Sequence, residues 1–440
     1  MSDCSGMWTD AYTYEMDAFW RVEKTAMVTW FKIAFRNLIK NKRRSFVTAL
    51  AISLGYAAVN LFGGFTTYIY NGNREASIYL AFRGHLNVFK KGFLKEGQLD
   101  PRSYLLSAAD IEAVEDICRE IPETLLVTPQ LNISGLISNG KVSTIFIGQG
   151  IVPSSIDVFL NRTTLINLVD IGRNALVDDK DYGVAVAYDL AHMLNLGVGS
   201  YAVAMSTTVD GQMNALDMEV FQLFEANSKQ LNDKFMRVPF SFAQKLYDTK
   251  SADRLVILLN KAERTEFVRA QLERAFAQKG LKLDVKTWIE QSEWYRRVKE
   301  MFDVIFLFLF TIVFVIVVMS IINTMSVAVL ERTREIGTLR ALGLKRRGIM
   351  LLFAIESSLL GFGGTLFGIF LSFLGWWWID FFRPTWTPPG VVTRIPLKIE
   401  FVPEFFGISF LILMALCILT SMIPARGAAH KNVVDALGHV

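Results

Sequence analysis

Cysteine and histidine are scarce in this chain of 440 residues, which contains three of the first and four of the second. Cys4, Cys118 and Cys417 lie far apart, and the topology described below places them in an N-terminal tail, an outer domain and a membrane helix. An intrachain disulfide is therefore not expected. The histidines have no second ligand at metal-binding spacing, so we expect neither a metal site nor a cofactor on this chain.

Charged residues are also few. They make up 20% of the chain, whereas hydrophobic residues make up 52% and the mean hydropathy is +0.33. This balance is too apolar for an ordinary soluble protein of this length and indicates a membrane protein. The net charge of +4 is small, and the basic residues gather at the ends of apolar segments. That distribution is typical of membrane topology, so no nucleic-acid partner is expected.

Four apolar runs are long enough to cross the roughly 30 Å of hydrocarbon in a lipid bilayer. They cover residues 46–68, 304–329, 349–373 and 405–423. An even number of spans puts both termini on one side of the membrane. The long segment between the first two spans must fold in water, so we predict an α-helical membrane protein with one large soluble domain.

Basic residues in short loops indicate which side of the membrane is cytoplasmic. They precede the first span, separate the second from the third and follow the fourth: Lys40, Lys42, Arg43, Arg44, Arg332, Arg334, Arg340, Lys345, Arg346, Arg347, Arg426 and Lys431. The opposite ends carry aromatic anchors such as Trp294 and Trp376. Both termini are therefore predicted to be cytoplasmic, and the large domain and a short proline-rich loop are predicted to lie outside.

The N-terminal 26 residues are polar and acidic, and they lack the basic start, apolar centre and cleavage site of a signal peptide. We predict a disordered cytoplasmic extension, with Met27 as an alternative start to Met1.

Residues 27–44 are predicted to form an amphipathic helix that lies flat on the membrane surface. The basic residues of this segment include Lys32, Arg36, Lys40, Arg43 and Arg44. The first three recur at every fourth position, and apolar residues occupy the rest of the helix. The last two would be costly inside hydrocarbon, so an elbow is expected near Asn41.

The soluble segment reads as an α+β domain. Ser107 is a suitable cap for a helix, and residues 254–288 follow a strand, helix, strand pattern that resembles half of a split α/β sandwich. Asn139-Gly140 between two β-like runs predicts a hairpin with a type I′ turn, in which both central residues have positive φ. Short β-like runs across residues 151–250 predict an inserted, mostly β subdomain.

The most informative stretch, residues 331–343, directly follows the second span. Ile336, Leu339 and Leu342 recur at threefold spacing and are predicted to share one side of a short helix, and Gly343 suits its end. In an unfamiliar protein this would be a positive-inside loop with a solvated helix. A protruding amphipathic helix otherwise needs a groove to fill.

The run Glu331-Arg332-Thr333-Arg334-Glu335-Ile336-Gly337-Thr338-Leu339-Arg340-Ala341-Leu342-Gly343 resembles the signature of the FtsX-like permease family, which includes the macrolide exporter MacB and the lipoprotein-releasing permeases LolC and LolE. The resemblance continues at residues 353–356, 363–368 and 423–429 and covers all the membrane parts. The soluble domain matches in layout only, as a porter-like α/β part with a β-rich insertion.

The resemblance implies an ATPase-coupling helix made of Glu331, Arg332, Thr333, Arg334, Glu335, Ile336, Gly337, Leu339, Arg340, Ala341, Leu342 and Gly343. It would sit in a groove of a cytoplasmic ABC ATPase subunit. The sequence has no Gly-x-x-x-x-Gly-Lys-Ser/Thr motif, so ATP and Mg are expected on that separate chain. The family also implies a second permease, identical or related, a periplasmic adaptor or carrier in some systems, and a bacterial inner-membrane location with the large domain in the periplasm.

Three further features belong to the membrane segments. Gly361, Gly364 and Gly368 form a small-residue face in the third span, for which helix packing is one reading and a dimer contact another. Glu356 is the sole carboxylate within residues 349–373, and we expect it to form a hydrogen bond to a neighbouring helix. The family motif at the end of the fourth span comprises Pro424, Ala425 and Arg426.

These readings divide the chain as follows: extension 1–26, interfacial helix 27–44, first span 45–70, periplasmic domain 71–290 with its insertion at about 151–250, stalk and second span 291–330, coupling helix and loop 331–348, third span 349–380, periplasmic loop 381–404, fourth span 405–424 and cytoplasmic tail 425–440.

Two functions from different classes remain open at this stage. The first is a permease subunit that moves or extracts an amphipathic cargo, such as a lipoprotein, lipid, peptide or drug, with ATP hydrolysed by its partner. The second is a mechanical signalling protein of the cell-division type, which regulates a periplasmic partner without transport. A membrane enzyme has little support, because no nucleophile stands beside a suitable base in sequence.

Overall fold

The computed structural model describes residues 29–97, 99–163, 165, 175–226, 229–387 and 394–430. The predicted N-terminal extension, Met27 and residues 431–440 lie outside the described residues. The chain divides into two compact units. The helical unit comprises the described parts of residues 1–68, 301–383 and 398–440, and the sheet unit comprises those of residues 69–300 and 384–397.

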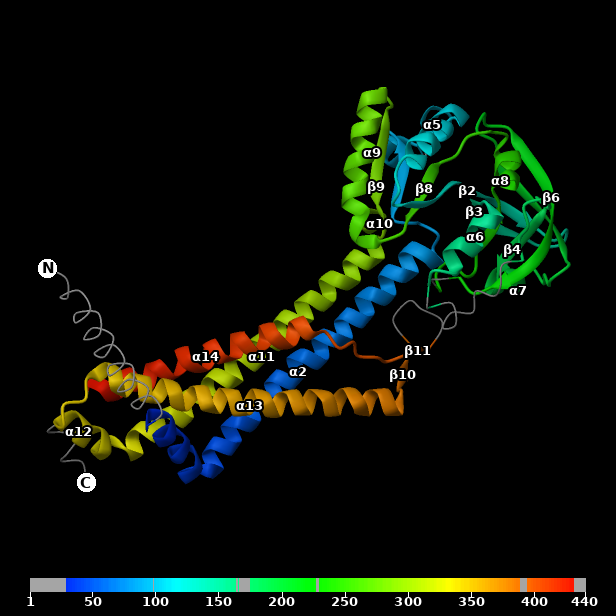
Figure 1. Ribbon diagram of the computed structural model, residues 1–440. Coiled ribbons are helices and arrows are strands. Elements are labelled where there is room, and N and C mark those ends of the chain that lie inside the picture. The colour runs from blue at the N-terminus through cyan, green and yellow to red at the C-terminus, as the bar shows by residue number, and fades with distance from the viewer. Residues whose placement is uncertain are drawn as a thin grey trace, which may run out of the picture. The chain divides into compact units, whose positions relative to one another are not determined.

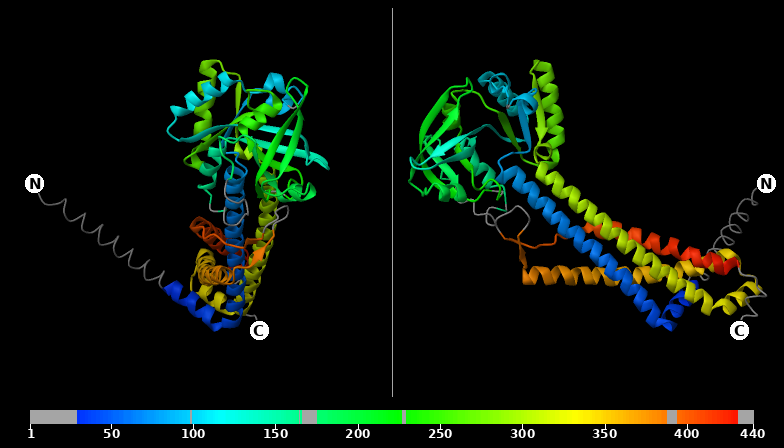
Figure 2. Two further views of the ribbon diagram at one scale, coloured as in Figure 1. Left: turned by 90° about the vertical axis from the view of Figure 1, so that its right-hand side faces the viewer. Right: turned by 180° about the vertical axis from the view of Figure 1, so that it is seen from behind.

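Four helices in the described residues are long and apolar enough to cross a membrane. They are α2 (Lys42–Glu75), α11 (Glu293–Glu331), α13 (Arg346–Phe382) and α14 (Pro403–His430), and they pack together in the helical unit (Figure 1, Figure 2). A π-helical turn, η1 (Ala76–Leu80), follows α2. Together with the large α/β sheet domain, these helices confirm the predicted fold class.

Polar side chains connect α2 to its neighbours. The hydroxyl of Tyr56 donates a hydrogen bond to the carbonyl of Phe406 in α14 at 2.8 Å, and the hydroxyls of Thr48 and Thr324 join α2 to α11. All of these hydrogen bonds lie between long apolar helices, where water cannot replace them. They therefore fix the register of α2 against α11 and α14.

Three glycines bring α13 close to other helices of the same chain. A Cβ added at Gly364 would lie 2.8 Å from Ile52 of α2, and one added at Gly368 would lie 2.9 Å from atoms of the same helix. A Cβ at Gly361 would lie 2.8 Å from the sulfur of Cys417 in α14. The structure thus shows packing within the chain at all three positions, and a dimer contact there would need faces that these helices already fill.

The fourth long helix does not end where the sequence analysis placed its end. We expected a cytoplasmic tail from residue 425, but α14 continues through Pro424 to His430. The proline lacks the N–H that a helix interior needs. Beyond it, however, Ala425, Ala428 and Ala429 are buried in the core of the helical unit, and this packing keeps the last two turns helical.

Nine strands of the sheet unit form one sheet in the order β3-β7-β4-β6-β5-β2-β8-β1-β9. Their bounds are β1 (Leu86–Lys90), β2 (Thr124–Ser138), β3 (Ser143–Ile151), β4 (Gly183–Ala187), β5 (Tyr201–Thr207), β6 (Met213–Phe224), β7 (Phe235–Pro239), β8 (Arg254–Leu259) and β9 (Leu283–Thr287). The long strand β2 pairs with β3, β5 and β8. Six strands, β2, β3, β7, β4, β6 and β5, therefore close into a ring of pairings, from which β8, β1 and β9 extend.

Helices cover both parts of this sheet. Inside the ring, α8 (Phe240–Tyr247) contacts several strands and contributes Phe242 to a core that includes Phe146 and Met236. Outside it, α5 (Ala108–Arg119) and α9 (Thr265–Lys279) pack on β1, β8 and β9. Ser107 caps α5 in a capping box with Asp110, and Gly280 ends α9 with a φ of 67°.

Short elements complete the described chain: α3 (Phe93–Glu96), α4 (Pro101–Tyr104), α6 (Pro153–Leu160), α7 (Tyr188–Met193), the 3-10 helix η3 (Ala262–Arg264), α10 (Trp288–Gln291), and the two-stranded sheet of β10 (Thr385–Trp386) and β11 (Ile395–Pro396).

The predicted type I′ turn at Asn139-Gly140 is wrong. The hairpin of β2 and β3 exists, but positive φ occurs at Gly140 and not at Asn139. The N–H of Asn139 donates to the carbonyl of Val142, so the central residues are Gly140 and Lys141. The side-chain oxygen of Asn139 accepts hydrogen bonds from the N–H groups of Lys141 and Val142, which is the local bonding that places asparagine first in a turn.

The expected division of the soluble domain at residue 151 also needs correction. Strands β4 to β7 do not form a sheet of their own, because β4 and β7 continue from β3, and β5 pairs with β2. The hairpin that we assigned to the α/β part is thus a wall of the same ring. The described part of residues 151–250 also includes the helices α6, α7 and α8.

His85 is fully buried beside β1. Its Nδ1 accepts a hydrogen bond from the N–H of Leu259 at 3.0 Å, while its Nε2 has no partner among the described residues. Burial, and then the positive charge of Arg74, lower the pKa of His85 to about 4, although the carboxylate of Glu263 opposes this shift. The imidazole is therefore neutral in the folded domain at neutral pH.

We expect acid to destabilise the sheet unit through His85. In the unfolded chain His85 takes up a proton near pH 6.5, whereas in the folded chain it does so near pH 4. The contribution of the neutral imidazole to the free energy of unfolding is therefore fully present above pH 6.5 and is lost as pH falls between these values. The loss approaches about 3 kcal/mol at pH 4. Thermal unfolding of the purified chain, followed by tryptophan fluorescence between pH 7 and pH 4.5, measures it.

The matched variant is His85→Gln, whose side-chain oxygen can accept the same hydrogen bond but does not titrate. Its unfolding temperature should fall less than that of the wild-type chain over the same pH range. Parallel pH profiles for the two proteins would show that other groups cause the acid sensitivity.

Candidate functional site

The segment singled out by the sequence is a separate short helix, α12 (Thr333–Ala341), directly after α11. The chain breaks between the two helices at Arg332, whose φ of −112° and ψ of 13° are not helical. Gly343, with a φ of 96°, lies beyond the other end and turns the chain toward α13. The break at Arg332 and the turn at Gly343 thus make α12 a short separate helix between the two long helices α11 and α13.

One face of α12 is anchored to the helical unit. Ile336 is 7% exposed and packs in a core that also holds Val329 of α11 and Ala428 of α14. The hydroxyl of Thr333 donates to the carbonyl of Val329 at 3.0 Å, and Gly337 is buried next to the same surface. These contacts fix the orientation of the helix.

The predicted apolar side of α12 is divided by this packing. We expected Ile336, Leu339 and Leu342 on one face, but Ile336 points inward, Leu339 is 37% exposed and Leu342 is 81% exposed. Threefold spacing turns a helix by about 300° per step, so three such residues drift around the axis rather than remain aligned. The outward face carries two leucines beside the exposed residues Arg334 and Glu335.

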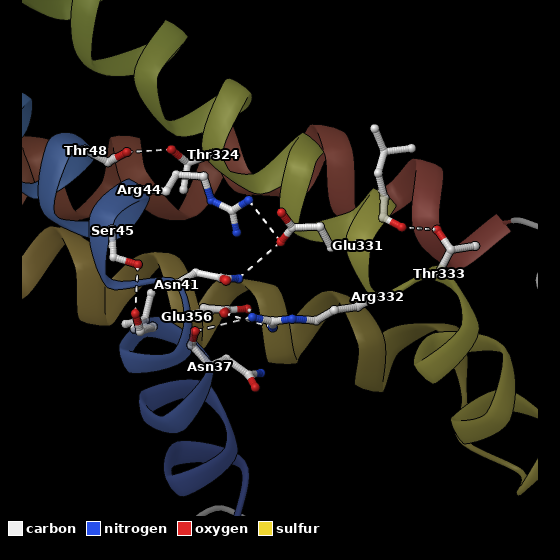
Figure 3. Close-up of polar contacts among 12 residues, drawn as sticks. Asn37, Asn41, Arg44, Ser45, Thr48, Thr324, Glu331, Arg332, Thr333 and Glu356 are labelled. Atoms are coloured by element: carbon white, nitrogen blue, oxygen red, sulfur yellow. Dashed lines mark hydrogen bonds and ion pairs between the residues drawn. The ribbon is translucent and has the colours of Figure 1, made fainter. Parts of the chain in front are cut away.

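A buried ion pair holds the start of α12. Nη1 of Arg332 lies 3.0 Å and 3.3 Å from the two carboxylate oxygens of Glu356 in α13 (Figure 3). Arg332 is 9% exposed and Glu356 is 2% exposed. Nη2 of the same arginine also reaches the carbonyl of Asn37, in a helix over residues 29–40, at 3.5 Å. The break after α11 is therefore bonded to two other segments of the helical unit.

A second, more exposed polar cluster lies beside this pair. The carboxylate of Glu331 accepts hydrogen bonds from Nη1 of Arg44 at 3.1 Å and from Nδ2 of Asn41 at 3.2 Å (Figure 3). Asn41 is the turn residue between the helix over residues 29–40 and α2. Consecutive residues at the end of α11 thus bond to both sides of this elbow.

The structure brings only some of the predicted site residues together. Arg44 joins the cluster of Glu331, whereas Lys32, Arg36, Lys40 and Arg43 are exposed. Arg340 is half-buried on α12, Ala341 and Gly343 are exposed, and of the C-terminal motif Ala425 is buried, Pro424 is half-buried and Arg426 is exposed.

Sequence reasoning did not foresee the roles of Asn37 and Asn41. One signal was available for the buried pair: a lone carboxylate in an apolar span and an arginine at the end of the preceding span are opposite charges that both need a partner.

Two protein-family descriptions match the chain. The MacB-like periplasmic core domain matches residues 45–275, which is more than half of the chain, and the FtsX-like permease C-terminal region matches residues 307–433. The second match includes all of α12 and all of α13. The first includes β1 to β8 of the sheet unit.

Curated relatives match over shorter stretches. Macrolide export ATP-binding/permease protein MacB 1 of Yersinia pestis bv. Antiqua (strain Antiqua) is 28% identical over 203 residues, which is 46% of this chain and 30% of the relative. The MacB protein of Shigella boydii serotype 4 (strain Sb227) is 36% identical over 118 residues, which is 27% of this chain and 16% of the relative. The matched stretches thus span less than a third of the length of these relatives.

Two solved structures are also similar to part of the chain. The periplasmic region of MacB from Actinobacillus actinomycetemcomitans aligns with 15% identity and a TM-score of 0.34, covering 48% of this chain and 92% of that one. The extracellular domain of the noncanonic ABC-type transporter YknZ from Gram-positive bacteria aligns with 14% identity and a TM-score of 0.33, covering 46% and 100%.

Proposed function

The chain belongs to the family of FtsX-like ABC transporter permeases with a MacB-like periplasmic core domain, and from this premise we propose that it is a permease subunit whose ATPase is a separate chain. The names of the curated relatives combine ATP binding and permease in a single protein. In this proposal the separate ATPase chain carries the phosphate-binding Gly-x-x-x-x-Gly-Lys-Ser/Thr motif, ATP and Mg.

The observation that carries the proposal is the two-faced packing of α12. Its inner face is bonded and packed into the helical unit, while its outer face presents Leu342 at 81% exposure beside Leu339 and Glu335. An apolar side chain so exposed at the end of a rigid helix is suited to a groove of a partner protein. We assign α12 as the coupling helix that contacts the ATPase.

Motion of the ATPase would then reach the membrane helices through the contacts of α12. The ion pair of Arg332 with Glu356 joins its start to α13, and the cluster of Glu331 joins it to Arg44 at the start of α2. α11 runs without a break from Glu331 back to Glu293, and its residues 293–300 belong to the sheet unit. A force on α12 would therefore act, through Arg332, on the continuous helix α11 of 39 residues.

In this proposal the protein lies in the bacterial inner membrane, with both termini in the cytoplasm and the sheet unit in the periplasm. It pairs with a second permease and moves or extracts an amphipathic cargo such as a lipoprotein, lipid, peptide or drug. The basic residues Lys32, Arg36, Lys40 and Arg43, exposed on the first helix and at the start of α2, support contact with a lipid surface. A periplasmic adaptor or carrier is a further partner of this class.

The proposal is tested by purifying the tagged chain from membranes of its host in detergent. We expect a second polypeptide with a Gly-x-x-x-x-Gly-Lys-Ser/Thr motif to co-purify, as identified by mass spectrometry, and the complex to hydrolyse ATP. Amphipathic probes that raise the ATPase rate in nanodiscs would favour transport over signalling. If no ATPase co-purifies under conditions that keep the chain folded, the proposal fails.

A further inference from the structure

A buried arginine in the sheet unit differs from the other buried charges of this chain. Among the described residues, the buried side chains that carry a charge at neutral pH are those of Arg237, Asp253, Arg332 and Glu356. Arg332 pairs with Glu356, and Asp253 pairs with Arg254 at 3.1 Å. Arg237 in β7 is 5% exposed and forms no ion pair with any residue that the structure describes. It is therefore an exception to the rule that buried charges are paired.

The guanidinium of Arg237 also lacks hydrogen bonds. It has five N–H groups that point outward in its own plane. Its Nε is enclosed by the protein and has no partner in the described chain. The two Nη nitrogens donate to none of the described residues either, but they are not enclosed, so an acceptor from outside the chain can reach them.

Two phenylalanine rings position this guanidinium. Cζ of Arg237 lies 4.1 Å from the centroid of the Phe224 ring and 4.9 Å from that of the Phe82 ring. Each ring packs edge-on against a further ring, Phe224 against Phe235 and Phe82 against Phe159. Rings in this position attract the positive charge, but they leave the N–H groups in the guanidinium plane without acceptors. The arginine is therefore held in place but not neutralised.

The backbone of Phe82 is strained where its ring meets the arginine. Its φ of 52° lies in the left-handed region, which is unfavourable for a bulky residue. The carbonyl of Phe82 accepts a hydrogen bond from Nε2 of Gln130 at 2.7 Å, and that of Ala81 accepts one from Nε2 of Gln149 at 3.4 Å. Gln149 is also the register partner of Arg237 across β3 and β7. The sheet thus holds Phe82 in this conformation beside the arginine, and such strain is most often kept at functional sites.

Neutral residues flank Arg237 in the sheet. Its register partners are Gln149 in β3 and Ala185 in β4. Burial lowers the pKa of Arg237 to about 9, so the guanidinium stays charged at neutral pH. A buried cation without a counter-charge is unfavourable, and binding of an anion would relieve this.

We propose that Arg237 anchors a binding site in the sheet unit for an oxyanion, namely the phosphate or carboxylate group of a small molecule. Two oxygens of either group match the planar fork of a guanidinium. Two sources can supply this chemistry, a free ion and the headgroup of an amphiphile. The site goes beyond the proposed function and does not require the ATPase.

Thermal unfolding of the purified full-length chain in nonionic detergent tests the site. Inorganic phosphate and acetate are each added at constant ionic strength, with chloride as the reference. Because phosphate also stabilises proteins through the solvent, wild type is compared with Arg237→Met, whose side chain packs on aromatic rings without a charge. The unfolding temperature of the wild type should rise with at least one anion by about 2 °C or more beyond the rise in the variant.

Two further variants separate recognition from folding. Arg237→Lys keeps the charge but loses the planar fork, so it should bind the anion at least about tenfold more weakly in equilibrium dialysis with the radiolabelled ion. Arg264→Met is the matched control, because Cζ of Arg264 lies 5.4 Å from the centroid of the Phe267 ring but the side chain is exposed. This variant should bind the anion as the wild type does.

Longer probes distinguish the two sources of the anion. Decyl phosphate and decanoate carry the same groups as phosphate and acetate on an apolar chain. Tighter binding of the longer probes would identify the headgroup of an amphiphile, and equal affinity would identify a free ion. Equal temperature shifts in wild type and Arg237→Met with both anions, or an equal loss of binding in Arg264→Met, would overturn the site and leave the proposed function intact.

Discussion

Replacing Leu342 with glutamate is expected to weaken binding of the ATPase by about a hundredfold or more. Leu342 is 81% exposed in the chain alone, and the proposed groove would bury it. A carboxylate placed there loses its hydration without gaining a partner, which is unfavourable by several kcal/mol, and each 1.4 kcal/mol is about tenfold in affinity. Co-purification of the ATPase and the rate of ATP hydrolysis measure the effect.

The conservative variant Leu342→Met separates charge from shape. It keeps an apolar side chain of similar volume and should retain ATPase binding. Because Leu342 makes no core contact, its glutamate variant should also unfold at the wild-type temperature. Leu339→Glu should uncouple the complex as well, but Leu339 is only 37% exposed, so its effect on folding is harder to separate. Wild-type ATPase binding and activity in Leu342→Glu would refute the assignment of α12.

Removing the carboxylate of Glu356 is expected to destabilise the helical unit strongly. In Glu356→Leu the guanidinium of Arg332 keeps its buried position but loses both carboxylate contacts, at 3.0 Å and 3.3 Å. Breaking a buried ion pair from one side typically reduces stability by about 3 to 5 kcal/mol. The unfolding temperature of the purified protein in detergent should fall, and ATPase binding should weaken with it, because Arg332 marks the start of α12.

The double variant Arg332→Met/Glu356→Leu is the control for this prediction. It removes both charges and replaces them with apolar side chains, a change that is often neutral for a buried pair. We expect it to recover most of the stability lost in Glu356→Leu. If the loss of stability in the double variant equals the sum of the losses measured for Arg332→Met alone and Glu356→Leu alone, the two residues do not interact and the assignment of the ion pair is incorrect.

The sequence was informative where one physical signal dominates. The four apolar runs predicted α2, α11, α13 and α14 because their length matches the hydrocarbon thickness, and the cap at Ser107 and the stop at Gly280 were readable from local chemistry. The closed ring of six strands was not readable. Closure depends on β2 being long enough to pair with β3, β5 and β8 at different points, which no local pattern encodes.

The candidate site was predicted in outline and missed in detail. The family signature located α12, but three residues at threefold spacing looked like one apolar face, and tertiary packing took Ile336 inward. The partner of Glu356 could be guessed as a neighbouring helix but not identified, since Arg332 is 24 positions away in sequence. The bond from Nδ2 of Asn41 to Glu331 joins residues 290 positions apart and depends wholly on the tertiary fold.

The sheet order has β9 at one end, beyond the strands that extend from the ring. An unpaired strand edge can recruit another chain and start aggregation, and charged residues on that edge oppose this. β9 places Asp284 and Lys286 among its five residues, and α9 packs beside it. A domain is exposed to such misassembly while it folds, and a charged terminal strand gives it protection at that stage.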